Sequence, residues 1–199
     1  MKDYGAITNQ NAKSYIRILG QRLQNAFPYA KHRFSSYEII ILNSTTPAAF
    51  SPGGSFIFLS KGLILSLTSE EELAFVIAHE MAHQELKHTA LAELKEKKYT
   101  EYKQIDAYMS EQNETLELEA DKFAAATLAQ AGYDPVLATQ AIFNAARKRQ
   151  DLQRNPQVLQ LLERRRMALQ KFLQKSRVRS YGLLLPQRNF LYFQSILRS

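Results

Sequence analysis

The pattern of hydrophobic and polar positions predicts a mostly helical chain with one short group of strands near its start. Residues 9–26 carry apolar side chains at close to a 3.6-residue period, which predicts an amphipathic helix. The runs 37–42 and 55–60 are rich in β-branched and aromatic residues and predict strands. They flank a proline- and glycine-rich segment in which residues 48–51 could form a further short strand.

A helix of buried character follows the strands. A Ser-x-x-Glu capping signal at 69–72 predicts that this helix begins at Glu70 and continues through Leu94 or beyond. Between positions 73 and 82 its apolar residues lie on every face, which is typical of a helix enclosed by other elements. Residues 93–113 are charged and polar, and their pattern favours no single structure.

Three further helices are predicted in the second half of the chain. The first covers about 115–131, where an apolar stripe ends at Gly132, a residue suited to stop a helix. Asp134-Pro135 then offers an N-cap and a first-turn proline for a helix through about position 149. The third is predicted over 157–174. We therefore expect an α+β, mostly helical fold.

Length and composition are those of one globular domain. The chain has 199 residues, of which 45% are hydrophobic and 23% charged. We predict a single domain over 1–180 and an apolar tail over 181–199 that could pack on the domain, dimerise or cover the cleft. No run approaches the roughly 18 apolar residues that suggest a membrane span. Cysteine is absent, so any bound metal must have nitrogen and oxygen ligands.

Positive charge is concentrated in the last quarter. From Arg147 to Ser199 there are 13 Lys and Arg against two acids, a net +11, so residues 1–146 carry −4 of the total +7. A solvated helix face is the simplest interpretation, and attraction to an anionic membrane surface is the next. Aromatic residues suited to base stacking are sparse in this quarter until Tyr181, and no nucleic-acid fold signature is present, so we expect no nucleic-acid partner.

Three polar residues interrupt the apolar run of the helix that begins at Glu70. His79 and His83 are four residues apart, about 40° of rotation, so both project from one face and can share a metal ion. Glu80 lies beside them. In an H-E-x-x-H arrangement the imidazoles bind zinc and the carboxylate takes a proton from the attacking water. The alternative, histidines that only hydrogen-bond in the core, leaves a buried carboxylate without a neutralising cation.

A third protein ligand must come from elsewhere in the chain. His88, nine residues after His79, would point about 180° away on a continuous helix, so we interpret it as structural or exposed. Glu117 and Asp121 lie four residues apart on the apolar side of the next long helix. We assign Glu117 as the third ligand and Asp121 as the acceptor that orients a ligating imidazole, most economically that of His79.

This donor set predicts a reaction. Two histidines, one carboxylate and an open fourth position are typical of a catalytic zinc site, so we predict one Zn2+ per chain and hydrolysis of peptide bonds. Glu80 would take the proton of the attacking water and deliver it to the leaving amine.

Further motifs occur in order along about half of the chain. They are Pro47-Ala48-Ala49-Phe50, Pro52-Gly53-Gly54, residues 56–63, Ser69 to Ala74, His79 to His83, Glu117 to Asp121 and Ala131 to Pro135. Together they resemble peptidase family M48, the zinc peptidases that include the CAAX prenyl proteases and the HtpX-like and BepA-like proteases.

The resemblance implies a gluzincin fold, a mostly helical domain with a small antiparallel sheet beside the active-site helix. It implies the same roles for His79, His83, Glu117, Glu80 and Asp121. It also places segment 48–54 along the cleft rim, where an edge strand could pair with an extended substrate backbone. A plain hairpin turn is the competing interpretation of that segment. The substrate-binding residues expected there are Ala49, Phe50, Ser51, Gly53 and Gly54. Such main-chain pairing favours unfolded or loop segments of polypeptides as substrates.

The chain departs from the family pattern in two ways. Many members have a later His-Pro whose histidine can assist the substrate oxyanion, whereas here Asn155-Pro156 is only a weak echo. Oxyanion support could come instead from one of several side chains. The candidates are Arg147, Arg149, an arginine among 164–166, Tyr133 and Tyr181. The second departure is the absence of membrane helices, which leaves the BepA-like or lipoprotein-like subgroup.

That subgroup implies a bacterial envelope or periplasmic protein that acts in protein quality control. The present start lacks a signal peptide, so either a leader is missing from this chain or the protein is cytoplasmic. Two other functions remain as alternatives: a metal-binding, chaperone-like module of low turnover, and a basic nucleic-acid-binding protein without zinc. The intact Glu80 favours the enzyme, because ligation alone does not need it. The sequence leaves the oligomeric state open.

Overall fold

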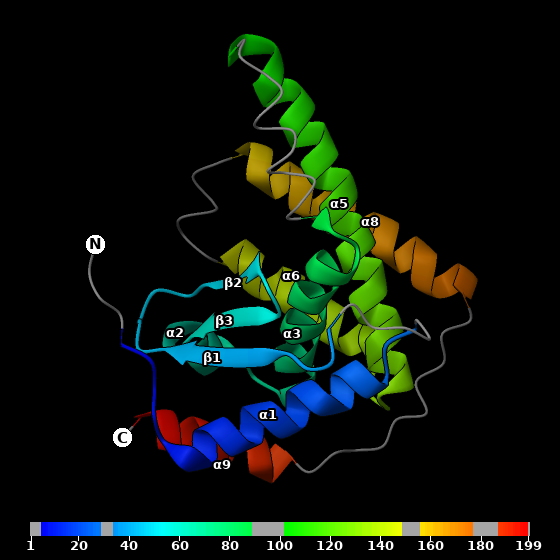
Figure 1. Ribbon diagram of the computed structural model, residues 1–199. Helices are drawn as coiled ribbons and strands as arrows, with labels where there is room; N and C mark the ends of the chain where they lie inside the picture. The colour runs from blue at the N-terminus through cyan, green and yellow to red at the C-terminus, as the bar shows by residue number, and fades with distance from the viewer. Residues whose placement is uncertain (1–4, 29–33, 89–101, 149–155, 177–186, 199) are drawn as a thin grey trace.

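The computed structural model describes residues 5–28, 34–88, 102–148, 156–176 and 187–198, and helices dominate this part of the chain (Figure 1). In chain order the elements are α1 (Gln10–Asn25), β1 (Glu38–Leu42), β2 (Ala49–Gly53), β3 (Phe56–Ser60), α2 (Lys61–Ser66), α3 (Glu70–Glu85), α5 (Tyr102–Gln130), α6 (Pro135–Lys148), α8 (Pro156–Ser176) and α9 (Gln187–Arg198). The predicted α+β, mostly helical class is confirmed.

The strands form a three-stranded sheet in the order β1-β3-β2. β2 and β3 are antiparallel, but β1 and β3 are parallel, so the prediction of a purely antiparallel sheet is wrong. The reason is that the chain reverses twice between β1 and β3, and β3 then pairs beside β1 while β2 takes the edge. The β2–β3 turn contains three residues with positive φ, Gly53, Gly54 and Ser55, of which glycine accepts such angles without strain.

The central helix α3 begins where the capping signal predicts. The Ser69 hydroxyl accepts a hydrogen bond from the N–H of Glu72 at 3.3 Å, while the Glu72 carboxylate accepts from the N–H and hydroxyl of Thr68 at 2.7 and 2.8 Å. Its apolar residues from Leu73 to Ala82 are largely buried, as predicted. The helix ends at Glu85 rather than at Leu94, however, so the predicted length is wrong.

The chain leaves α3 through a tight turn. The N–H of Leu86 donates to the carbonyl of Ala82 at 2.9 Å, and the N–H of Lys87 donates to the carbonyl of Gln84 at 3.1 Å. Lys87 has φ 61°, a left-handed conformation that ends a helix. The apolar pattern continued past this point, but no sequence signal such as glycine marks the stop.

The later helices agree with the sequence pattern except at the start of α5, which begins at Tyr102 and not at about position 115. α5 ends before Gly132, whose φ of 86° stops the helix as predicted. The side chain of Asp134 accepts hydrogen bonds from the N–H groups of Val136 and Leu137 and so caps α6. α8 covers the predicted 157–174 with two more residues at its end.

α3 lies at the centre of the molecule. It packs against α5, α6 and α1, and against β2 on the sheet side. Figure 1 shows α3 between the sheet and the long helix α5, with α1 and α9 together along one side. One hydrophobic core includes residues of these elements, so the H-E-x-x-H motif is carried on a helix that is enclosed on several sides.

The last helix belongs to the same body. Phe190, Phe193 and Leu197 of α9 are buried in the common core, and Phe193 stacks on Tyr15 of α1 with ring centroids 4.2 Å apart. The Gln194 side chain donates to the carbonyls of Ile64 and Leu67, both at 2.9 Å. Of the three alternatives for the tail, residues 187–198 follow the first and pack on the domain. Within the described part of the chain no helix is both long and apolar enough to cross a bilayer.

Candidate metal centre

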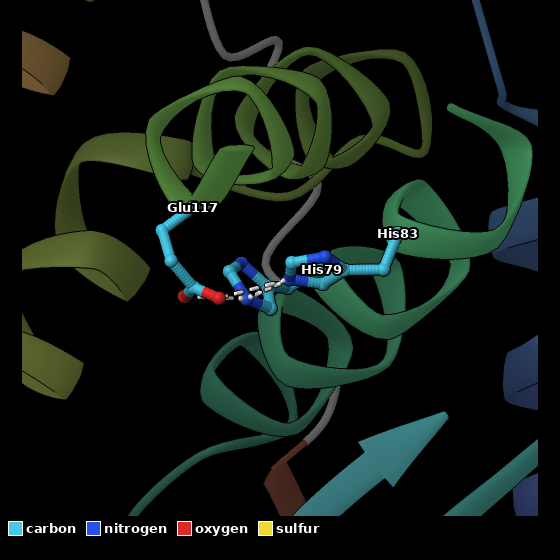
Figure 2. Close-up of side chains that lie close together, drawn as sticks. All are labelled: His79, His83 and Glu117. Carbon is cyan, nitrogen blue, oxygen red and sulfur yellow. Dashed lines mark hydrogen bonds and ion pairs between the residues drawn. The ribbon is translucent and has the colours of Figure 1, made fainter. Parts of the chain in front are cut away.

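Side chains of two helices converge at the centre of the molecule. The four-residue spacing on α3 turns His79 and His83 toward α5, and Glu117 of α5 points back at both rings (Figure 2). α3 and α5 pack along each other, so all three side chains come from helices and none from a loop. Within the described residues, these three form the group that offers one ligand atom each within 4.8 Å of one another.

The separations of the donor atoms suit a small cation. The two Nε2 atoms of His79 and His83 lie 3.0 Å apart. The carboxylate oxygens of Glu117 lie 3.4 Å from each of these nitrogens. Donors around a tetrahedral zinc at about 2.0–2.1 Å from the ion are separated by about 3.3 Å. Two imidazoles and one carboxylate therefore fit a divalent metal, with room for a fourth ligand.

A second layer of charged groups surrounds this cluster. Asp121 Oδ1 lies 3.0 Å from the Nδ1 of His79, an ion-pair distance without hydrogen-bond alignment, and Asp121 is 1% exposed. Arg165 of α8 donates from Nε and from one terminal nitrogen to the two oxygens of Asp121, both at 2.9 Å. Its other terminal nitrogen lies 3.0 Å from Glu117 Oε2. The single positive charge of Arg165 is thus shared by the carboxylates of Glu117 and Asp121.

These contacts shift the pKa values of the metal-free site. Burial lowers the pKa of His79, but Asp121 and Glu117 outweigh it and raise that pKa to about 10. For His83, burial and the neighbouring His79 lower the pKa to about 4. Burial raises the pKa of Glu117, yet His79 and Arg165 bring it down to about 2. The metal-free cluster therefore holds an imidazolium on His79, a neutral His83 and an ionised Glu117.

Glu80 lies beside the cluster on the sheet side. The hydroxyl of Ser51 in β2 donates to Glu80 Oε2 at 2.8 Å. Burial raises the pKa of Glu80 above the usual value of a carboxyl group. The β2–β3 hairpin is tied to α3 by Gln84, which accepts from the N–H of Ser55 at 2.9 Å and donates to the carbonyl of Phe56 at 2.7 Å. The edge strand is thereby held next to Glu80.

Comparison with known proteins agrees with this geometry. The model of the family described as "Peptidase family M48" matches residues 11–100, which include α3 and the H-E-x-x-H motif. Over residues 11–100 the chain is thus similar to peptidase family M48. A relative from Vibrio cholerae serotype O1, whose name marks it as a candidate beta-barrel assembly-enhancing protease, is 32% identical over 147 residues. That match covers 60% of this chain and 30% of the relative, so the chain spans well under half of the relative's length.

The cluster and its immediate surroundings contain every residue predicted for the metal site, and His88 lies against them. His79, His83 and Glu117 converge, Asp121 lies against His79 and Glu80 lies alongside. The prediction that His88 points to the opposite side is wrong, because α3 ends at Glu85 and the turn brings His88 back against His83. His88 is buried and does not join the three-residue group.

The predicted substrate segment forms the edge strand of the sheet. Ala49, Phe50, Ser51 and Gly53 lie in β2, and Gly54 follows in the turn. Ser51 donates a hydrogen bond to Glu80, while Phe50 is 46% exposed and stacks on Phe58. The segment is a tight hairpin and also an edge strand beside α3, and its contact with substrate stays a prediction.

The structure places the side chains that were considered for oxyanion support at different distances from the cluster. Tyr133 lies far from the site, because its hydroxyl donates at 2.7 Å to Glu70, nine residues or about 13 Å along α3 from His79. Arg164 and Arg166 pair with Glu114 and Glu163. Arg165 alone of the three touches the cluster. Arg149, Asn155 and Tyr181 and the side chain of Arg147 lie outside the described residues. The sequence of three consecutive arginines does not predict which side chain points toward the cluster. That depends on how α8 packs against α5.

Proposed function

We propose that this chain is a zinc-dependent endopeptidase that hydrolyses peptide bonds in unfolded or misassembled polypeptides. The observation that carries the proposal is the convergence of His79, His83 and Glu117 at zinc-like separations, with Glu80 next to them. A structural zinc site would be closed by a fourth protein ligand, whereas the described residues supply three. The match of residues 11–100 to a peptidase family supports the same interpretation.

The proposed mechanism divides the work between the ion and the protein. Zinc held by His79, His83 and Glu117 would polarise the scissile carbonyl and lower the pKa of water at the site. Glu80 takes a proton from the attacking water and passes it to the leaving amine, a transfer that its raised pKa favours. Ser51 donates to one oxygen of Glu80, so the other oxygen remains available as acceptor.

The proposed substrate is an extended polypeptide segment bound along β2. This strand pairs on one side with β3 and forms the edge of the sheet, so its other edge offers main-chain hydrogen bonds. Pairing of this kind needs an unfolded or loop segment and reads little of the side chains. We include Ala49, Phe50, Ser51, Gly53 and Gly54 as its contact residues.

The proposed setting is protein quality control in the bacterial cell envelope. It is supported by the name of the Vibrio cholerae relative, which refers to beta-barrel assembly. Peripheral attraction of the basic last quarter to anionic membranes stays a prediction. Part of that charge is offset by ion pairs within the chain, because Arg164, Arg165 and Arg166 each pair with an acidic side chain.

The test is metal analysis of the purified protein together with cleavage of casein. One zinc per chain is expected, with casein cleavage that stops on removal of the metal by 1,10-phenanthroline and returns when zinc is added back. A wild-type protein without stoichiometric zinc would overturn the proposal. Stoichiometric zinc without cleavage of casein or of any unfolded polypeptide would favour the alternative, a chaperone-like binding module.

Zinc binding is expected to release close to one proton at pH 7.5. The pKa of His79 is about 10 in the metal-free protein, so its ring is charged at this pH and must become neutral to bind metal. Apparent zinc affinity should accordingly rise with pH. Calorimetric titrations in two buffers of different ionisation enthalpy measure the proton count. Asp121→Asn should reduce that count, since Asp121 helps hold the proton on His79; equal counts in both proteins would contradict this account.

A further inference from the structure

His88 is a buried histidine that the mechanism above does not use. It is 4% exposed and lies against His83 of the proposed metal site. The turn at the end of α3 places it there, because Lys87 adopts φ 61° and His88 does not continue along the helix. A side chain with two polar nitrogens in such a position needs partners for both.

Both ring nitrogens of His88 have a polar neighbour. Its Nδ1 lies 3.1 Å from the Nδ1 of His83, and the two rings stand at 75° with centroids 5.0 Å apart. Its Nε2 lies 3.3 Å from Oε2 of Glu119 on α5. A continuous chain of polar contacts thus leads from the proposed metal ligand His83 to a carboxylate that is 53% exposed at the surface.

The chemistry of imidazole allows one arrangement of protons along this chain when His83 binds metal. The Nε2 of His83 faces the cluster, 3.0 Å from the Nε2 of His79, so its lone pair must be free and its proton must sit on Nδ1. That Nδ1–H needs an acceptor, and the neighbouring Nδ1 of His88 can accept only if His88 carries its proton on Nε2. The Nε2–H of His88 then donates to the Glu119 carboxylate.

We propose that His88 and Glu119 form a hydrogen-bond relay that holds His83 in its metal-binding tautomer and orientation. The inference rests on the proposed function of the site. His88 is a positioning residue, because its nitrogens contact the Nδ1 of His83 and the Glu119 carboxylate and it does not join the three-residue donor group. Asp121 has the corresponding position at the other histidine, because its Oδ1 lies 3.0 Å from the Nδ1 of His79. A carboxylate of α5 therefore faces the Nδ1 side of each α3 histidine, directly at His79 and through His88 at His83.

Two amide substitutions of His88 separate positioning from mere packing. The amide oxygen of His88→Asn can take the place of Nδ1 and accept from His83, whereas the longer side chain of His88→Gln reaches the place of Nε2 and leaves His83 without an acceptor. We expect zinc affinity, measured by competition with a chromogenic chelator, to fall about 10–100-fold in His88→Gln and to stay within about threefold of wild type in His88→Asn. Glu119→Gln, which keeps an acceptor, should bind zinc like wild type, and Glu119→Ala more weakly.

A second readout does not depend on zinc. Long-range 1H–15N spectra of the metal-free protein report the tautomer of each histidine ring, and His83 is expected in the Nδ1–H form in wild type and in His88→Asn. In His88→Gln the Nδ1–H of His83 should lose its acceptor, which would shift its proton resonance upfield and speed its exchange with water. Circular dichroism and thermal melts identify any variant that has not folded, and only folded variants are compared.

The outcomes distinguish the relay from the function on which it rests. Equal zinc affinity in the Asn and Gln variants, or His83 in the Nε2–H form in the wild type, would overturn the relay. Wild-type protein that binds no zinc would overturn the proposed function instead, and the ring spectra would then still decide whether His83, His88 and Glu119 are linked as described.

Discussion

Glu80→Gln is expected to lower the rate of casein hydrolysis by about 10²–10⁴-fold, the usual contribution of a general base, while one zinc per chain is retained. Glutamine keeps the size and the acceptor oxygen that receives the Ser51 hydroxyl at 2.8 Å, but it cannot take a proton from water. Glu80 lies outside the three-residue donor group, so the metal should not need its charge. Zinc content and casein cleavage of the same preparation measure both effects.

Glu71→Gln is a matched control for Glu80→Gln, because it makes the same chemical change in the first turn of α3, away from the site. Its activity should equal that of the wild type. Unimpaired hydrolysis in Glu80→Gln would remove Glu80 from the mechanism. Loss of zinc together with activity would instead assign Glu80 to the metal shell.

Arg165→Met is expected to lower the free energy of unfolding of the metal-free protein by about 3 kcal/mol at pH 7, the scale of breaking a buried ion pair from one side. The guanidinium contacts Asp121 at 2.9 Å and Glu117 at 3.0 Å, and its side chain is 13% exposed. Methionine fills similar volume without charge, so two carboxylates of α5 would lose their shared cation. Urea titration followed by circular dichroism measures the change.

Arg164→Met is the control for this substitution, since it removes the neighbouring arginine of the same helix. Arg164 pairs with Glu114 at 2.8 Å, but its side chain is 57% exposed, and exposed ion pairs contribute little to stability. The free energy of unfolding should therefore fall clearly less in Arg164→Met than in Arg165→Met. Similar stabilities in both would mean that the Arg165 contacts do not hold α8 to α5 in the manner described.

The local signals of the sequence were reliable where one element could be judged alone. The helix periods, the Ser69 and Asp134 caps and the Gly132 stop all correspond to observed boundaries, because each depends on residues within one turn of the helix. The strand runs were also found, but not their pairing. Whether β1 pairs with β3 in parallel depends on the path of the β1–β2 and β2–β3 connections. The residues of β1 themselves do not indicate that path.

The end of α3 shows how one misjudged boundary changes a functional interpretation. On a helix extended to Leu94, His88 would lie opposite His79; with a left-handed turn at Lys87 it lies against His83. Lysine is not a residue that favours positive φ, so the sequence gives little warning. The turn is stabilised by tertiary contacts, among them the burial of His88 and its approach to Glu119.

The chemistry of the centre was determined by the sequence, because the i, i+4 spacing of two histidines and the adjacent Glu80 place these groups by helix geometry alone. The choice of Glu117 and Asp121 followed from the same rule applied to α5. Only the tertiary structure decided which groups surround them: Arg165 from a run of three arginines, Ser51 from the edge strand and His88 from beyond the helix end. Those contacts join residues that are 5 to 48 positions apart in the sequence. They depend on how separate elements pack, which the periodicity within one element does not predict.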